Sequence, residues 1–204
     1  MTKTSKNILA VSVAMGVLWT GTAFAKQGSP EFMSVSGKTS QPIGHYEYCK
    51  IYRSDCSISS RDTSPTKLTK ARWQAMQRIN SGVNQRVMPV TDMDLYHVEE
   101  EWAYPERYGD CEDYVLEKRR LLMQEGWPAS SLLITVVLQP NGDGHAVLTV
   151  RTDYGDYILD NMRGDVRLWS ETGYTFVKRQ SSENASQWTK LGAGSAANVG
   201  AVSN

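Results

Sequence analysis

Three residues of the chain could form a nucleophilic triad, Cys111, His145 and Asp160, in that order. A thiol that gives up its proton, an imidazole that accepts it and a carboxylate that orients the imidazole support acyl transfer through a thioester. Each residue alone has an ordinary explanation. A lone cysteine on a helix is usually core, a lone histidine in a strand is usually structural, and an aspartate at a strand end often forms a turn. The triad hypothesis therefore depends on the elements that position these side chains.

Cys111 lies in the stretch "YGDCEDYV", among carboxylates that disfavour a thiolate. The stretch "CEDYVLEKRRLLMQEG" predicts a helix that begins at Cys111 and stops before Gly126 and Pro128. Its polar residues form one narrow stripe, so we expect the helix to be mostly buried. The stripe consists of Asp113, Glu117, Arg120 and Gln124. At such a helix N-terminus, unpaired N–H groups and a neighbouring imidazolium would offset the acidic surroundings and could hold a developing oxyanion.

The histidine and the aspartate lie on two segments that read as a β-hairpin. Residues 145–151, "HAVLTVR", alternate as a strand does, and residues 157–161, "YILDN", return after a turn at 153–155. This hairpin brings His145 nearly opposite Asp160, within about two residues of register, where side chains can touch. Residues 131–138 and 174–180 also read as strands. A helix is predicted with Ser64 as its N-cap and Pro65 as its first residue, and it is expected to end at Ser81 and Gly82. A turn and a shorter helix are predicted within 89–102.

The beginning of the chain predicts export. Residues 1–25 combine a basic start, a short apolar stretch and the small-residue site Ala23-Phe24-Ala25, as a cleaved signal peptide does. A retained membrane anchor would need a longer apolar run. We therefore expect a periplasmic protein, cleaved after Ala25. The 22 basic and 22 acidic residues of the whole chain balance, which gives no electrostatic reason to expect a nucleic acid or an anionic membrane as partner.

The three cysteines are Cys49, Cys56 and Cys111. In an oxidising compartment we expect Cys49 to pair with Cys56, which leaves Cys111 as a free thiol. A zinc site with His45 is the alternative, although no fourth ligand lies nearby. Residues 26–64 show no sustained period and are expected to form an irregular arm held by the disulfide. The domain itself is expected over 65–189, followed by a disordered tail over 190–204. His45 and His97 are given no catalytic role.

Several motifs resemble those of the bacterial transglutaminase-like cysteine proteinases, which include the LapG-type periplasmic proteases. They are "GDCEDYVLEKRRLL", "GWP", "GHAVLTV" and "LDN", and the resemblance runs from about Leu68 to Trp188. It implies an α+β protein with a papain-like, transglutaminase-core fold, in which helices accompany an antiparallel sheet. It also implies that Cys111 is the nucleophile, His145 the general base and then acid, and Asp160 the residue that orients the imidazole.

The same resemblance implies calcium dependence and no organic cofactor. Asp110 and Glu112, with Asp113 as a third, match the acidic positions beside the cysteine, and hard oxygen ligands suit calcium. A bound cation would also offset the repulsion of these acids toward a thiolate. The alternative is that they only favour a helix N-terminus. Trp102, just upstream, could donate its indole N–H to an oxyanion, or it could serve packing.

The function that follows is an exported cysteine endopeptidase whose substrate is a protein. LapG-type members cut a surface adhesin and are held in check by an inner-membrane receptor that senses cyclic di-GMP. The predicted disulfide arm is not part of that pattern. Two other functions stay open at this point. One is transglutaminase-type acyl transfer to an amine, and the other is a non-catalytic exported binding module.

Overall fold

The computed structural model describes Met1 and residues 31–192. The predicted signal peptide, apart from Met1, and residues 193–204 of the predicted tail lie outside the described residues. Within the described part of the chain, no helix is both long enough and apolar enough to cross a membrane.

The centre of the fold is a seven-stranded antiparallel sheet in the order β1-β9-β8-β4-β5-β6-β7. Its strands are β1 (Val35–Thr39), β4 (Leu132–Leu138), β5 (Gly144–Thr152), β6 (Gly155–Leu159), β7 (Arg167–Leu168), β8 (Thr175–Gln180) and β9 (Trp188–Leu191). Two short strands, β2 (Met88–Pro89) and β3 (Tyr108–Gly109), form a separate parallel pair. The four strands that the sequence predicts, β4, β5, β6 and β8, are confirmed to within about two residues at their ends.

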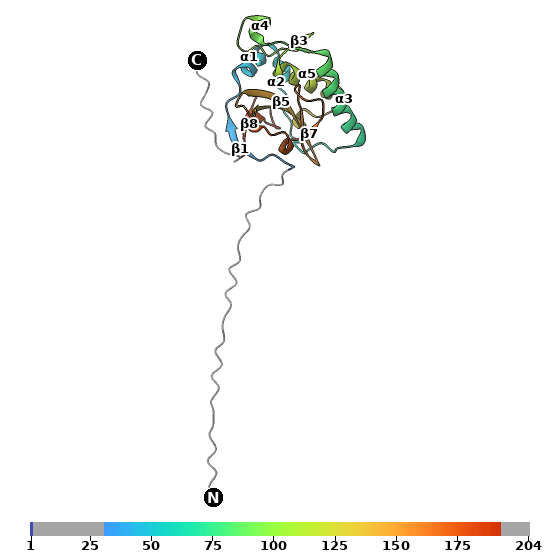
Figure 1. The fold of residues 1–204 in the computed structure, drawn as a ribbon, viewed down its shortest axis with the longest axis vertical. Helices are drawn as coiled ribbons and strands as arrows, with labels where there is room; N and C mark the ends of the chain where they lie inside the picture. The colour runs from blue at the N-terminus through green and yellow to red at the C-terminus, as the bar shows by residue number, and fades with distance from the viewer. Residues whose placement is uncertain (2–30, 193–204) are drawn as a thin grey trace.

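The helices gather on one side of this sheet (Figure 1). They are α1 (Ile43–Ile51), α2 (Arg53–Cys56), α3 (Lys70–Arg86), α4 (Asp92–Tyr96) and α5 (Cys111–Gln124), with short 3₁₀ helices at Ala129–Ser131 and Trp169–Glu171. The helix that the sequence predicts to begin at Cys111 does so, and α4 is the shorter helix predicted before it. Helices plus one large antiparallel sheet make the protein α+β, as expected.

Helix α5 packs against β5 on one face and α3 on the other, so it is buried along most of its length. Val115 and Leu122 of α5 share one core cluster with Ala146 and Leu148 of β5. A second cluster that includes Val147 covers the opposite face of the strand. Because both faces of the central strands are buried, their sequences are almost continuously apolar. This packing fixes the N-terminus of α5 over the end of β5 that carries His145.

The first long helix differs from the prediction at both ends. Helix α3 begins at Lys70, with Thr69 as its N-cap, rather than at Pro65, and it continues through Gly82 to Arg86. The segment before it is held extended by the β5–β6 hairpin, because Thr66 N donates to Arg151 O at 3.0 Å and Leu68 N to the Asp153 carboxylate at 2.7 Å. These contacts between distant residues prevent the earlier start that the local sequence favours.

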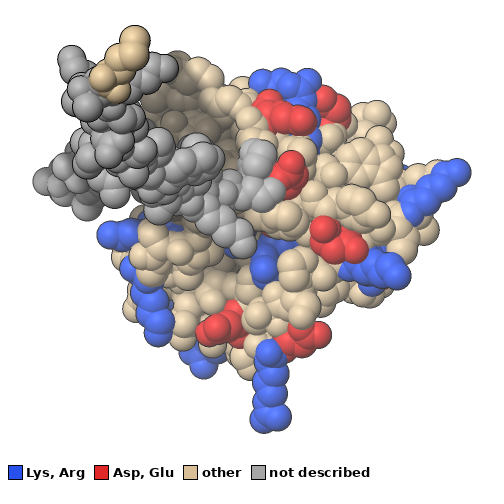
Figure 2. Space-filling view, turned by 90° about the horizontal axis from the view of Figure 1, so that it is seen from below, with Lys and Arg blue, Asp and Glu red and all other residues tan. Residues whose placement is uncertain are grey.

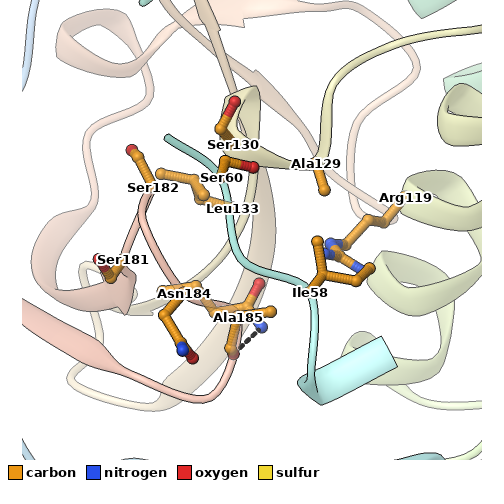
Figure 3. A pocket seen from close by; sticks show the side chains of 11 residues that line it. Ile58, Ser60, Arg119, Ala129, Ser130, Leu133, Ser181, Ser182, Asn184 and Ala185 are labelled. Carbon is orange, nitrogen blue, oxygen red and sulfur yellow. Dashed lines mark hydrogen bonds between the residues drawn. The ribbon is translucent and has the colours of Figure 1, made fainter. Parts of the chain in front are cut away.

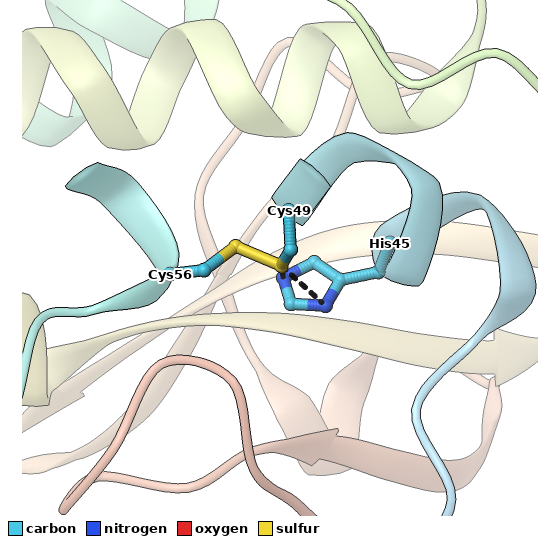
Figure 4. Close-up of side chains that lie close together, drawn as sticks. All are labelled: His45, Cys49 and Cys56. Carbon is cyan, nitrogen blue, oxygen red and sulfur yellow. Dashed lines mark hydrogen bonds between the residues drawn. A yellow bond between two sulfur atoms is a disulfide. The ribbon is translucent and has the colours of Figure 1, made fainter. Parts of the chain in front are cut away.

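The prediction of an irregular arm over residues 26–64 is wrong for the part that the structure describes. β1 pairs with β9 at the edge of the main sheet, and α1 and α2 follow it. β1 is mostly exposed and the two helices are short, so none of them leaves a clear apolar period in the sequence. The predicted disulfide between Cys49 and Cys56 is confirmed and joins α1 to α2 (Figure 4).

The expected tail also begins too early. Lys190 and Leu191 belong to β9, and Gly192 N donates to Ser34 O at 2.7 Å. The domain predicted over 65–189 therefore shares its sheet with residues on both sides of those limits. On the described part of the face in Figure 2, basic and acidic side chains are interspersed, in keeping with the balanced charge of the chain.

Candidate active site

The predicted histidine–aspartate pair is in contact. His145 lies near the start of β5, and Asp160 directly follows β6. The two strands are joined by a two-residue turn, in register Thr152↔Gly155 to Leu148↔Leu159. This register places His145 Nε2 2.9 Å from Asp160 Oδ1, with both side chains buried. When Nε2 carries the proton, it donates to the carboxylate and leaves Nδ1 as the basic nitrogen.

Asp160 is held from several directions. Its Oδ1 also accepts from Met162 N at 2.9 Å, and its Oδ2 accepts from the Tyr174 hydroxyl at 2.6 Å. The Tyr174 ring meets the His145 ring edge-on, with centroids 5.7 Å apart. Burial raises the pKa of Asp160, but the hydrogen bonds from His145 and Tyr174 outweigh it, so its pKa lies below the usual value. The carboxylate is therefore ionised and fixed in orientation beside the imidazole.

Two asparagines of α3 hold the backbone of Asp160. Asn80 Oδ1 accepts from Asp160 N at 3.1 Å, and Asn84 Nδ2 donates to Asp160 O at 2.9 Å. Neither these asparagines nor Tyr174 were predicted from the sequence. Their four-residue spacing on the side of α3 that faces the core was a usable signal, because a polar pair at i and i+4 on a buried face needs partners.

Cys111 is the first residue of α5 and reaches the same end of β5. Its Sγ accepts a hydrogen bond of 3.4 Å from the backbone N of Ala146, the residue that directly follows His145. Its thiol donates to Glu112 Oε2 at 3.1 Å. The cysteine thus lies at the end of the β5–β6 hairpin that carries the His145–Asp160 pair, and its sulfur contacts the backbone of the residue next to His145.

The surroundings of Cys111 favour the protonated thiol. Burial first, and the Glu112 carboxylate second, raise the pKa of the Cys111 thiol well above its usual value. Burial and the charge of Asp110 raise the pKa of Glu112 itself to about 9. Formation of a thiolate therefore requires a base and a reduction of the negative potential around Cys111.

Three carboxylates form an acid cluster beside the cysteine: Asp92, Asp110 and Asp113. One oxygen of each lies within 4.8 Å of the others. Each residue also has a buried oxygen with no hydrogen-bond partner in the described residues: Asp92 Oδ1, Asp110 Oδ1 and Asp113 Oδ2. Burial raises the pKa of all three carboxyls, that of Asp113 to about 8. Buried polar atoms without partners are rare in folded proteins, so these three oxygens could accept a bound group.

Gly109 allows the close approach of Asp113. A Cβ atom at position 109 would lie 2.5 Å from Asp113 Oδ2, so any other residue would displace that carboxylate. Asp113 Oδ1 accepts from Ala103 N at 2.8 Å, which fixes the other half of the group. Three ionisable oxygen donors, partly fixed by backbone contacts, fit a hard divalent cation such as calcium.

The acid cluster differs from the predicted calcium ligands Asp110, Glu112 and Asp113. Asp92 takes the place of Glu112, whose carboxylate accepts from the cysteine thiol. Asp92 is the first residue of α4 after the cap Thr91, a position where acids are common without any ligand, so its sequence gave no signal.

In the structure, the indole N–H of Trp102 donates to a glutamate side chain and not toward the site of an oxyanion. Trp102 is buried, and its Nε1 donates to Glu100 Oε2 at 2.9 Å. Its ring packs edge-on against His45, with centroids 5.5 Å apart, and a Cβ at Gly44 would collide with it. This arrangement favours the packing role over the role in catalysis.

Lys118 is a second feature that the sequence analysis missed. It lies on the side of α5 that faces the core, fully buried, and among the described residues its Nζ has no hydrogen-bond partner. Burial lowers the pKa of Lys118 to about 7, while the charge of Asp160 opposes this shift. Lys118 is therefore a buried amine with a lowered pKa that lies near the Asp160 carboxylate.

His45, Cys49 and Cys56 form the cystine cluster, in which all ligand atoms are already engaged (Figure 4). The two sulfurs are bonded to each other. His45 Nδ1 accepts from Trp188 Nε1 at 3.3 Å, and Nε2 contacts Gln180 Nε2 at 3.1 Å. Burial, with a smaller effect of the Arg119 charge, lowers the pKa of His45 to about 4. The zinc alternative is therefore wrong for the oxidised chain.

Comparisons with known proteins agree with this architecture. Residues 35–196 match the model of one family, the bacterial transglutaminase-like cysteine proteinases. Among solved structures, calcium-bound LapG of Legionella pneumophila is similar, with a TM-score of 0.51 and 23% identity over 60% of this chain and 71% of that chain. Another LapG structure from the same organism has a TM-score of 0.48 and 22% identity over 74% of this chain and 88% of that chain. The comparison with curated proteins finds no match.

Proposed function

The chain belongs to the bacterial transglutaminase-like cysteine proteinases, and from this premise we propose that Cys111, His145 and Asp160 are its catalytic residues. The observation that carries the proposal is the buried contact of His145 Nε2 with Asp160 Oδ1 at 2.9 Å, beside the Ala146 N–H that reaches the Cys111 sulfur. A thiol, an imidazole and an orienting carboxylate at one end of a hairpin are the groups that thioester chemistry needs.

In this proposal, Asp160 accepts from Nε2 and leaves Nδ1 of His145 to take the proton of Cys111. The thiolate attacks the carbonyl carbon of the scissile peptide bond, and the imidazolium gives its proton to the departing amine. The acyl group is then bound to Cys111 as a thioester. His145 next takes a proton from water, whose oxygen attacks the thioester and releases the acid product and the thiol. The free N–H groups at the start of α5 supply donors for the oxyanion.

The acid cluster supports a calcium site made of Asp92, Asp110 and Asp113. Each of the three has a buried oxygen without a partner in the described residues, and such oxygens are the ligands that calcium prefers. The similar LapG structure is calcium-bound, which agrees with this assignment. Bound there, the cation supplies positive charge that offsets the carboxylates around the cysteine. The residues of this chain then need only His145 as base to form the thiolate.

The proposal extends to location and substrate. The signal-peptide pattern of residues 1–25 supports export to the periplasm, where the Cys49–Cys56 disulfide would persist. A periplasmic protease meets proteins at the cell surface. We propose a surface adhesin as the substrate and an inner-membrane receptor that holds the protease in check. Comparing the proteins shed by wild-type cells and by cells with Cys111→Ala would identify the substrate.

The catalytic assignment is tested by alkylation of Cys111 with iodoacetamide over a pH series. We expect His145→Asn to slow alkylation near neutral pH, because the carboxylates would then dominate the pKa of the thiol. We expect Asp160→Asn to lower turnover by about 10²-fold or more with the fold intact, because the imidazole loses its orienting acceptor. His97→Asn is the matched control, since His97 is exposed at the end of α4. If His145→Asn reacts as fast as wild type at every pH, His145 is not the base.

A further inference from the structure

Arg119 of α5 is a buried cation that forms no direct ion pair in the described residues, although the charge of Asp55 acts on it at longer range. Its side chain is 4% exposed, and in the described residues it forms no ion pair. Its one hydrogen bond there is from Nε to Leu132 O at 3.0 Å. Four further N–H donors remain on the two Nη atoms. Burial of a guanidinium is costly unless other groups satisfy it, so these donors call for a partner.

Arg119 lines two cavities, and they differ greatly in size. The smaller, shown in Figure 3, also involves Ile58 and four serines, but it has room for about 10 Å³, which is one water molecule. The larger is a cavity of about 350 Å³. It is open to solvent and is lined by Tyr52 between α1 and α2, Asp55 of α2, Tyr104 of the loop before β3, and Arg119, Arg120, Met123 and Gln124 of α5. A volume of this size is in the range of ligand-binding pockets.

The groups that line the larger cavity without a hydrogen bond in the described residues are the Nη donors of Arg119, the Tyr52 hydroxyl and the Gln124 amide. Asp55 is the one carboxylate among the residues that line it, and its Oδ2 accepts from the hydroxyls of both Tyr48 and Tyr104. Arg120 is paired with Glu117 and lies over the Tyr104 ring at 5.4 Å. Among these groups only Arg119 carries a charge, and it lies beside the tyrosines and the Met123 side chain that also line the cavity. A carboxylate next to an aromatic or aliphatic side chain would complement these walls.

The cavity is connected to the candidate active site through two elements. The segment that carries Tyr104 contacts the acid cluster one residue earlier, where Ala103 N donates to Asp113. Helix α5 begins at Cys111 and passes Arg119 and Met123, about 12 and 18 Å further along its axis. An extended peptide covers these distances with about four to five residues.

We propose that this cavity is an exosite that binds an acidic side chain of the protein substrate, about four to five residues from the bond that is cut. This rests on the proposed protease function, because it assigns the occupant of the cavity to the substrate. The cavity adds specificity by holding the anionic side chain on Arg119 and its apolar neighbour against Tyr52, Tyr104 and Met123.

The test is calorimetric titration of the intact chain with two blocked probe peptides, Ac-Gly-Phe-Glu-Gly-Gly-NH₂ and the same peptide with Gln for Glu. We expect the Glu peptide to bind about tenfold more tightly, with the difference falling as salt is added. Arg119→Gln should abolish the difference, Arg119→Lys should keep part of it, and Arg167→Gln, on the half-buried edge strand β7 and not among the residues that line the cavity, should leave it unchanged. Met123→Glu should also abolish it by placing a carboxylate in the cavity, which serves if Arg119→Gln does not fold.

Equal binding of the two peptides to wild type would overturn the exosite, as would a preference that survives in a folded Arg119→Gln variant. Sodium glutarate that competes with the Glu peptide at the affinity of the peptide itself would indicate a small-molecule site instead and would also overturn it. Alkylation of Cys111 is followed in the same samples. Normal alkylation with no peptide preference rejects the exosite alone, whereas failed alkylation counts against the protease function.

Discussion

The acid cluster and the cystine cluster look alike as sets of potential metal ligands, since each brings three ligand atoms to within 4.8 Å of one another. They differ in whether those ligand atoms already have bonding partners within the protein. In the cystine cluster, the sulfurs are bonded to each other and both nitrogens of His45 have neighbours within 3.3 Å. In the acid cluster, three carboxylate oxygens are buried without partners in the described residues.

This difference shows that proximity of ligand atoms is not sufficient evidence for a metal site. Lone pairs that are already used stabilise the fold, whereas buried lone pairs that are unused raise its free energy until something binds them. The directions of the pKa shifts follow the same division. Burial lowers the pKa of His45, which keeps it neutral, and raises the pKa of Asp113, which makes the carboxylate costly to ionise. The two clusters should therefore respond oppositely to pH and to metal.

The largest expected effect is on the acid cluster when calcium is removed. Binding to the folded state alone stabilises it by about 4 kcal/mol at 1,000 times Kd, or roughly 8–16 °C in Tm. The pKa of Asp113 is raised to about 8, so its contribution to stability in chelator is present below about pH 4 and is lost as the pH rises toward 8. We expect scanning calorimetry in EGTA to show a Tm that falls over this range and that added calcium restores.

Asp113→Asn tests both effects at once, because it removes a calcium ligand and a buried charge, and the two losses change the stability in opposite directions. We expect it to abolish the calcium response and yet to raise the stability of the chelated protein at pH 8. Glu106→Gln, an exposed acid in the loop before β3, is the matched control and should keep the response of wild type. A wild-type Tm that does not change with millimolar calcium would reject the site and leave the triad untouched.

The cystine cluster should set the acid limb of the stability profile. The folded pKa of His45 is about 4 against about 6.5 unfolded, so the stability it contributes is complete above about pH 6.5 and is lost as the pH falls through 4. The free energy of unfolding falls by about 3 kcal/mol over this pH range. We expect urea unfolding to show a smaller difference between pH 7 and pH 4 in His45→Gln than in wild type or in His97→Asn. Equal differences in all three would mean that His45 is not the group that titrates.

Removal of the disulfide should have a slightly smaller effect. Cys49 and Cys56 are seven residues apart in the sequence, and closing so short a loop stabilises the folded state by about 2.5 kcal/mol. We expect the double variant Cys49→Ser, Cys56→Ser to lose about this free energy of unfolding in urea. Its calcium response and the alkylation of Cys111 should stay unchanged. A lost calcium response would show that the two clusters are coupled through the residues between them.

The smallest expected effect is that of zinc on the cystine cluster. With calcium present in excess to occupy the acid cluster, zinc should change the Tm of the oxidised chain by less than about 1 °C, because no free ligand atom remains on His45, Cys49 or Cys56. A shift of several degrees that disappears in the double serine variant would contradict the contrast between the clusters.

The sequence predicts the parts of the site that local patterns control. The periodic apolar face between Cys111 and Gly126 predicts a buried helix, and alternation with a short turn predicts the register that brings His145 to Asp160. These signals involve neighbours in the chain, so periodicity reveals them. The same reasoning failed for residues 26–64, because β1 is exposed at a sheet edge and α1 and α2 are too short to show a period.

By itself, the sequence thus determined the class of fold, the order and local placement of Cys111, His145 and Asp160, and the pairing of Cys49 with Cys56. Only the tertiary structure decided that Asp92 joins Asp110 and Asp113, that Asn80, Asn84 and Tyr174 hold Asp160, and that Arg119 lines an open cavity. These contacts join residues from different elements, such as Asn80 and Asp160, which are 80 positions apart. They form only when α3, α5 and the β5–β6 hairpin pack together, and no local period encodes that packing.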